Sequence, residues 1–315
     1  MVSTPIHKEL LVDDQSQKIG EEFANIRGKH LLELGNIEQM VRSMAPLPIS
    51  YDVARLQPPY FSEFTYTEML GNMYICPQSS EITARLVLES LKDESQYTFN
   101  VIDHIEARDK YELNEVDGPT YKRVAFLPGS NIFNDAVSRD LLHRAMADFE
   151  DLVIKPHPLT NPDHIRWYSG TFGAHRILDP MESGWYYLKH AEEVFVTTTT
   201  EMGLYATLDA KPIHNVTRFE YEARGAYNAF YRPLWNVDTN EAQTLLRRSL
   251  NSPLSGFFHK CDPQLEMKIK KYYELAMLWR EFYKPLVFEM TNIDWASTLV
   301  NRGKPIGDIN AIRKS

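Results

Sequence analysis

The segment "YKRVAFLPGSNIFNDAVSRDLLHRAMADFEDLVIKPHP", residues 121–158, decides the fold of this chain. It opens with an apolar run that ends at Pro128 and Gly129, and apolar residues then recur at helical spacing over 132–149. A second apolar run, 150–158, ends in two prolines. This order of strand, loop, helix and strand predicts parallel strands in a sheet that is buried on both faces.

The same alternation continues downstream. The pattern predicts a short helix over 183–191, a strand over 192–200, a helix over 201–210 and a fourth strand over 211–216. These elements define one α/β lobe, whose strands and helices alternate to about residue 260 and whose range we take as 121–284. A strongly helical stretch, 263–283, ends this range.

The first 120 residues predict a second, smaller α/β lobe. Residues 71–91 have the pattern of strand, loop and helix, and residues 97–109 that of another strand, which ends at Asp103 and His104. The turn residues of 114–120 predict a linker between the lobes. Pro285 interrupts the carboxy-terminal helical pattern, and we expect 285–315 to pack back on the lobe formed by 1–120.

Composition restricts the classes of function. The chain has 315 residues, 43% of them hydrophobic, and a formal net charge of -9, which disfavours tight, sequence-independent binding to nucleic acid. Its two cysteines are too few for a disulfide framework and lack the spacing of a zinc cluster. No run of 18 apolar residues or signal peptide is apparent, so the sequence predicts a soluble, cytoplasmic protein without a transmembrane segment.

Polar loops follow three successive strands of the lobe 121–284. Because open parallel sheets bind ligands at the carboxyl ends of their strands, these loops should converge on one rim. Glycine, hydroxyl, lysine and histidine groups, together with the amides at helix starts, suit a phosphate-type anion. The candidates on the three loops are Gly129, Ser130, Asn131, Lys155, His157, Pro158, Thr198, Thr199 and Thr200.

The order of "VAFLPGSN", "DLVIKPHP" and "AEEVFVTTTTEMGLYATLDAKPIHNV" resembles the nucleotide-binding lobe of GT-B glycosyltransferases, above all the bacterial capsule and Kdo transferases. It is also similar to bacterial sialyltransferases with a His-Pro motif, and "FLPGS" resembles a loop of lipid A disaccharide synthase. The resemblance covers 124–217 and implies two Rossmann-like lobes with parallel sheets and a cleft between them. It also implies that His157, Pro158 and the threonines 198–200 bind the phosphate of a nucleotide-sugar donor.

The chain departs from the family's pattern in the helix that follows the threonines. Tyr205 stands where the family usually has a glutamate for the donor's ribose or sugar, and Ala210 replaces a glycine. Glu201 lies four residues before Tyr205, on the same helix face, and is therefore a candidate to take the place of the missing carboxylate.

The aromatic and basic segment 218–235 lies where such a lobe would place a loop against the donor. Arg224 or Arg232 is a candidate partner for phosphate, and Tyr221 or Tyr227 for stacking on a base. An aromatic surface between the lobes is an equally good interpretation of this segment.

Glycosyl transfer to a hydroxyl also needs a general base. The candidates are Asp103, with His104 beside it, and then Asp13 and Asp14. The sequence contains no Asp-X-Asp motif at a strand end and no cluster of histidines and carboxylates, so we expect neither a metal nor a cofactor besides the nucleotide-sugar co-substrate.

The resemblance therefore predicts a metal-independent GT-B glycosyltransferase that acts on an acceptor hydroxyl. The acceptor is either a glycan of a capsule or envelope polysaccharide, or a hydroxymethylated DNA base in a phage. A UDP-sugar 2-epimerase and a noncatalytic nucleotide-binding module are the alternatives. The donor base and sugar, the stereochemistry and the oligomeric state stay open.

Overall fold

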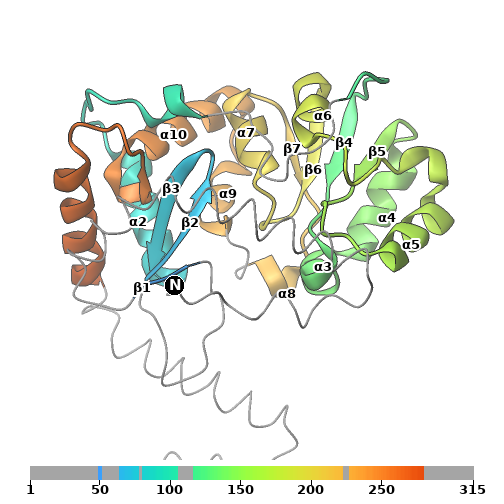
Figure 1. The fold of residues 1–315 in the computed structure, drawn as a ribbon, viewed down its shortest axis with the longest axis horizontal. Helices are drawn as coiled ribbons and strands as arrows, with labels where there is room; N and C mark the ends of the chain where they lie inside the picture. Colours follow the sequence, from blue (N-terminus) through green and yellow to red (C-terminus); the bar gives the residue numbers. More distant parts are fainter. Residues whose placement is uncertain (1–48, 52–63, 78–79, 106–115, 223–226, 280–315) are drawn as a thin grey trace, which may run out of the picture.

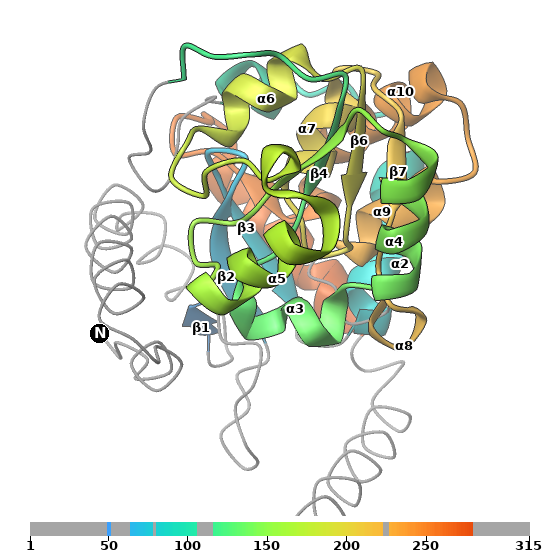
Figure 2. The ribbon, with the colours of Figure 1, turned by 90° about the vertical axis from the view of Figure 1, so that its right-hand side faces the viewer.

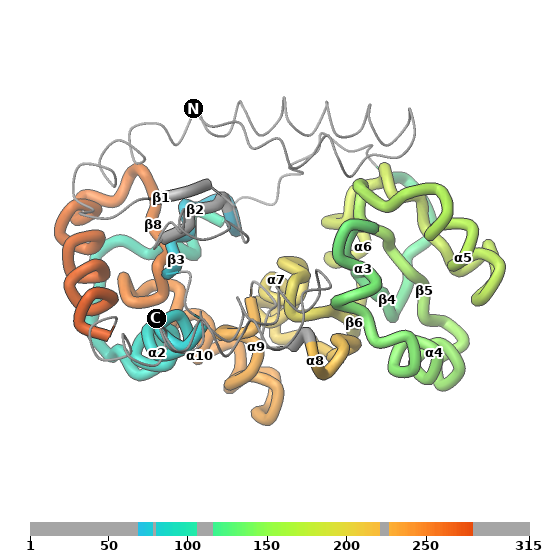
Figure 3. Tube along the Cα trace, turned by 90° about the horizontal axis from the view of Figure 1, so that it is seen from below, coloured from blue at the N-terminus to red at the C-terminus, as the bar shows by residue number. Residues whose placement is uncertain are grey.

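The computed structural model describes residues 49–51, 64–77, 80–105, 116–222 and 227–279. These residues form two four-stranded sheets with helices around and between them (Figure 1). Helices α7 (Met202–Leu208) and α9 (Asn228–Leu234) lie between the two sheets, as Figure 3 shows from below. The chain is thus an α/β protein, as its sequence predicts.

The sheet formed by the middle of the chain is entirely parallel, which confirms the prediction for that segment. Its strands stand in the order β5-β4-β6-β7, and each pairs in parallel with its neighbour. The strands are β4 (Arg123–Phe126), β5 (Leu152–Lys155), β6 (Glu193–Val196) and β7 (Ile213–Asn215). Helices α5 (Pro162–Phe172), η3 (Ala174–Arg176) and α6 (Gly184–His190) connect β5 to β6.

The single helix predicted over 132–149 is two helices, α3 (Ser130–Ala136) and α4 (Arg139–Asp148). Val137 leaves the helical conformation and forms an antiparallel bridge with Thr217, beyond β7. Ser138 then caps α4, because its Oγ accepts a hydrogen bond from the N–H of Leu141 at 3.3 Å. The capping serine and the bridge at Val137 therefore break the helix at this point, although the apolar residues continue at helical spacing.

The other sheet is mixed, in the order β1-β2-β3-β8, so the prediction of two parallel sheets is wrong for this half. Its strands are β1 (Ile49–Tyr51), β2 (Phe64–Met69), β3 (Asn72–Pro77) and β8 (Phe257–Phe258). Only β1 and β2 are parallel. Leu70 and Gly71, with φ angles of 55° and 71°, join β2 to β3. A two-residue turn of this kind makes a hairpin, whereas a parallel connection needs a long crossover.

The strand predicted over 97–109 is also wrong for the part that the structure describes. Residues Val101–His104 form a 3-10 helix, η2. Asn100 begins it, because its side chain accepts a hydrogen bond from the N–H of Ile102 at 3.2 Å. A short polar side chain that bonds to the following backbone competes in this way with an extended conformation. The helix predicted within 71–91 is present as α2 (Ser80–Lys92).

Segments from the far end of the chain complete the mixed sheet. Strand β8 pairs with β3, and both α10 (Thr239–Asn251) and the short helix η4 (Pro253–Ser255) pack on α2. The short helix α8 (Phe219–Glu222), by contrast, lies against α3 of the parallel half. Residues 265–279 are helical, and their buried side chains join Met73 and Ile75 in one core. The range 285–315, expected to pack back on the first lobe, lies outside the described residues.

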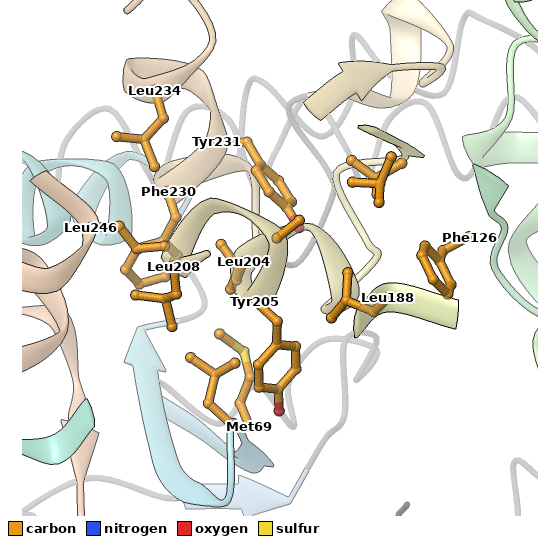
Figure 4. Close-up of a cluster of buried hydrophobic side chains, with 14 of the residues drawn as sticks. Met69, Phe126, Leu188, Leu204, Tyr205, Leu208, Phe230, Tyr231, Leu234 and Leu246 are labelled. Atoms are coloured by element: carbon orange, nitrogen blue, oxygen red, sulfur yellow. The ribbon is translucent and has the colours of Figure 1, made fainter. Parts of the chain in front are cut away.

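One hydrophobic core connects the two sheets (Figure 4). Met69 and Leu70, at the tip of the β2–β3 hairpin, belong to the same buried cluster as Leu204 of α7 and Phe230 of α9. A separate core covers the other face of the parallel sheet and includes Phe133 of α3. Because the first core is shared, the described residues of both sheets are packed into one body.

Candidate functional site

The order of the parallel strands places a topological switch point between β4 and β6. The chain runs from β4 to β5 on one side, and returns to form β6 on the other side of β4. Loops at the carboxyl ends of strands diverge at such a point, and ligands of open α/β sheets bind there. Figure 2 shows these loops at the edge of the sheet beside α3. We call this edge, with the loops 127–131, 156–161 and 197–201, the carboxyl rim.

In the loop after β4, Gly129 is the residue that precedes α3. Its φ of -62° is ordinary, but a Cβ there would lie 3.4 Å from the Cβ of Leu159 and 3.1 Å from Oδ1 of Asn131. The loop after β5 thus occupies part of the space that glycine leaves open. Asn131 is exposed on the first turn of α3.

Ser130 connects two loops of the carboxyl rim. Its Oγ accepts a hydrogen bond from the backbone N–H of Asn161 at 2.8 Å, and lies 2.8 Å from Nδ1 of His164. Asn161 in turn caps α5, because its Oδ1 accepts from the N–H of His164 at 2.9 Å. These bonds fix the first turn of α5 against the first turn of α3.

At the end of β5, the side chain of Lys155 is buried and bonds to backbone carbonyl groups, so its ammonium does not face an open site. Its side chain is 3% exposed, and Nζ donates to the carbonyl oxygens of Pro156 and Pro180, both at 3.0 Å. A buried ammonium that is satisfied by carbonyl dipoles holds the strand end against the segment before α6. Pro158 is buried as well.

His157 is half-buried, and its Nδ1 accepts a hydrogen bond from the N–H of Leu159 at 3.0 Å. A ring nitrogen that accepts carries no proton, so a neutral His157 carries its hydrogen on Nε2. The backbone therefore selects the tautomer with a donor on the far side of the ring.

The threonines after β6 bond mainly to one another. Oγ1 of Thr197 lies 2.8 Å from Oγ1 of Thr199 and 2.9 Å from Oγ1 of Thr200. The backbone N–H of Thr198 donates to Oγ1 of Thr217 at 3.0 Å, which joins this loop to the loop after β7. Oγ1 of Thr198 is buried without a hydrogen-bond partner among the described residues. Thr199 is half-buried, whereas its three neighbours are buried.

Glu201 connects the carboxyl rim to the mixed sheet. Its Oε1 accepts a hydrogen bond from the N–H of Leu70 at 2.9 Å and another from the hydroxyl of Tyr205 at 2.7 Å. Tyr205 is buried, and its ring meets that of Trp185 edge to face. Thus the carboxylate of Glu201 and the hydroxyl of Tyr205 both take part in the contact between the sheets.

The structure does not bring the two candidate bases to the carboxyl rim. Asp103 is exposed on η2, which packs against α10, whereas the rim loops leave the parallel sheet near α3 (Figure 1). The ring of His104 stacks on those of Phe99 and His259, at centroid distances of 4.4 and 4.5 Å, and these two rings are 5.5 Å from each other.

Several other candidates lie elsewhere or outside the described residues. Arg232 is exposed on α9. The backbone N–H of Tyr227 donates to the carbonyl of Thr198 at 2.9 Å, which places this residue next to the rim. The candidates outside the described residues, or with side chains outside them, are Asp13, Asp14, Tyr221 and Arg224. Within the described ranges, no three histidine, cysteine or carboxylate side chains are grouped so that they could hold a metal ion.

The sequence-based candidates omit Asn161 and His164, which complete the contact to Ser130. A signal for them was present, because "NPDH" (161–164) has the N-cap asparagine and first-turn proline of a helix start. Burial and the charge of Arg139 lower the pKa of His164, while Asp163 acts in the opposite direction. The imidazole is therefore neutral at pH 7 in the absence of a ligand.

Comparison with known proteins gives this geometry no family name. No protein-family model matches the chain, and no curated protein matches it. Among the described residues, no helix is both long and apolar enough to cross a membrane.

Proposed function

We propose that this chain is a nucleotide-sugar-dependent glycosyltransferase with the two-lobed arrangement of the GT-B type, and that its donor binds at the carboxyl rim. The observation that carries the proposal is the convergence of three polar loops at the switch point between β4 and β6. Side-chain bonds between neighbouring loops hold them in fixed positions, and pre-organised donors are what an anionic ligand requires.

In this proposal the diphosphate of the donor lies over the loops 127–131 and 156–161. Ser130 and the Nε2–H of His157 supply hydrogen bonds to phosphate oxygens, and Thr199 supplies a hydroxyl from the other side of the switch point. Lys155 has a supporting role, since its ammonium is bonded to two carbonyl groups. The same donors would stabilise the charge of the leaving nucleotide during transfer.

The acceptor in this proposal is a glycan hydroxyl, as in the polysaccharide-building enzymes that the rim loops resemble. A hydroxymethylated DNA base is the second candidate acceptor, and the net charge of -9 argues against it. The proposal does not assign the general base to Asp103 or His104, because they lie beside α10.

The first experiment is a thermal-shift screen of the wild type with UDP, GDP, CMP, ADP and dTDP and with their sugars. A ligand that binds only the native state stabilises it by about 2.7 kcal/mol at a hundredfold excess over Kd. We expect one nucleotide to raise Tm, and the shift to disappear in His157→Asn. Asparagine can still accept from the N–H of Leu159 but lacks the donor at the Nε2 position. His175→Asn, an exposed histidine of η3, is the matched control.

Turnover assays with the selected sugar then separate the candidate functions. A transferase transfers the sugar to an added acceptor, an epimerase converts the nucleotide-sugar without an acceptor, and a binding module does neither. Absence of any nucleotide-dependent shift, or an equal shift in His157→Asn, would contradict donor binding at the carboxyl rim.

A further inference from the structure

The hydroxyl of Ser130 has a constrained set of hydrogen bonds. A serine hydroxyl offers two lone pairs and one proton. The N–H of Asn161, at 2.8 Å, occupies one lone pair of Oγ. The contact with Nδ1 of His164, also 2.8 Å long, uses either the proton or the second lone pair. The protonation of His164 therefore decides what Ser130 can still offer to a ligand.

Two states follow from this geometry. When the His164 ring carries its hydrogen on Nε2 alone, Ser130 donates its proton to Nδ1 and keeps one lone pair. When Nδ1 is protonated, it donates to Ser130, and both lone pairs of Oγ are then occupied. In that second state the hydroxyl can act only as a hydrogen-bond donor. The acceptor that such a donor binds most strongly is an anionic oxygen.

The groups that face His164 come from three helices. Arg139 of α4 and Asp163 of α5 are the charged residues that act on the ring, and Asp163 also pairs with Arg166. The ring of Phe133, from α3, lies 4.8 Å from that of His164 between centroids. Burial and Arg139 together lower the pKa of His164 in the absence of a ligand. An anion beside Ser130 adds a negative charge near the ring and favours the imidazolium form.

We propose that Ser130 and His164 form a proton-linked contact for an oxyanion of the phosphate type at the carboxyl rim. Ser130 donates its hydroxyl proton to the anion, His164 donates its Nδ1 proton to Ser130, and the imidazole takes up one proton from solvent when the anion binds. This inference rests on the proposed function, because it assigns a residue pair to the same site. Its test needs no nucleotide, so the two can fail separately.

The probe is sulfate, because its charge is constant between pH 5 and 8, and the ring of His164 is followed by NMR at constant ionic strength. The resonance is assigned by its absence in His164→Asn. We expect sulfate to raise the pKa of His164 in the wild type and in Ser130→Thr, which keeps the hydroxyl, and to leave it unchanged in Ser130→Ala. Sulfate affinity should fall by up to about tenfold per pH unit as pH rises through the titration of His164.

His143, an exposed histidine of α4, is the internal control, and its titration should not respond to sulfate. Far-UV circular dichroism of Ser130→Ala establishes that the variant is folded. An unchanged pKa of His164 with saturating sulfate, or equal rises at His164 and His143, would overturn the inference.

The nucleotide screen separates this inference from the proposed function. If sulfate raises the pKa of His164 through Ser130 but no nucleotide binds, the proton-linked contact stands and the glycosyltransferase proposal falls. If a nucleotide binds with the same affinity in the wild type and in His164→Asn at every pH, the proposed function stands and the proton-linked contact is wrong.

Discussion

The two sheets differ in where their polar groups end up. In the parallel sheet every strand ends at the same edge, so the polar residues after β4, β5 and β6 lie along one rim. Ser130 bonds to Asn161 of the next loop, and the threonines after β6 bond among themselves. In the mixed sheet, antiparallel neighbours end at opposite edges. Polar side chains near it, such as Ser90 and Lys268, bond to single partners inside the packing, Ser249 and Asp262. The arrangement of strands thus decides whether polar residues gather into a site or serve stability.

Contacts with residues that are distant in the sequence stabilise the mixed sheet. Ile75 of β3 donates its N–H to the carbonyl of Gly256 at 2.9 Å and accepts a hydrogen bond from the hydroxyl of Tyr272 at 2.7 Å. Lys268 and Asp262 form a buried ion pair on the same side of the molecule. Changes around this sheet should therefore affect stability strongly, whereas changes at the carboxyl rim should affect mainly binding.

The largest effect on stability is expected for Lys268→Met. Both side chains of the Lys268–Asp262 pair are 2% exposed, so removal of the lysine leaves a buried carboxylate without its counter-charge. Loss of one partner of a buried pair costs about 3–5 kcal/mol. Urea unfolding measures this loss. Lys270→Met, at an exposed position of the same helical segment, should change stability little. Equal effects of the two substitutions would show that the pair contributes nothing specific.

The next largest effect on stability is expected for Gly256→Ala in the mixed half, and Gly129→Ala in the parallel half is its comparison. Gly256 has a φ of 85°, and a Cβ there would lie 2.1 Å from the carbonyl oxygen of Ile75. Gly256→Ala combines a left-handed conformation with overpacking, and we expect a loss of about 3 kcal/mol. Gly129→Ala has ordinary φ and contacts of 3.1 Å or longer, so its loss should stay within about 1 kcal/mol. Similar urea midpoints for the two variants would contradict the contrast.

The parallel sheet and the mixed sheet also differ in how much of their structure the sequence predicts. The parallel sheet is predictable because each strand and its next helix are neighbours in the chain, so local pattern is enough. Strand β8 has two residues and pairs with a strand about 180 residues earlier, and no local pattern specifies such a partner.

Within the candidate site, the sequence predicts which loops lie at the carboxyl ends of the strands, but it does not predict the hydrogen bonds of each side chain. His157 and Ser130 lie in loops of the carboxyl rim. The ammonium of Lys155, however, donates a hydrogen bond to the carbonyl of Pro180, 25 residues away in the chain. Glu201 likewise bonds to Leu70 of the other sheet. Both partners come from segments whose positions depend on tertiary packing.

A smaller effect is expected for Asp93→Asn, at the residue that follows α2. Although burial raises it, hydrogen bonds from Ser252, Ser95 and Tyr97 lower the pKa of Asp93 to about 2. A carboxylate with a depressed pKa stabilises the fold above its unfolded value near pH 4, and this contribution is lost as pH falls towards 2. Because Asp93 is partly exposed, we expect a loss of only about 1 kcal/mol at pH 7.

The pH dependence of urea unfolding tests this contribution. The difference in unfolding free energy between wild type and Asp93→Asn should shrink towards zero as pH falls from 4 to 2. Asp117→Asn, at an exposed position, is the control and should show no such trend. A difference that stays constant with pH would mean that the charge of Asp93 is not what stabilises this end of α2.

The smallest effect concerns the parallel half, where Ala210 lies two residues after the end of α7. Its φ is 54°, and the N–H of Lys211 bonds to the carbonyl of Ala206 at 2.9 Å, the pattern of a helix end that favours glycine. Ala210→Gly removes the cost of the left-handed conformation but increases the entropy of the unfolded chain. The net gain should be about 0.5–1 kcal/mol in urea unfolding, and a loss would contradict it. Leu70, with the same φ sign, offers no such gain, because its buried side chain fills the core between the sheets and glycine there would leave a cavity.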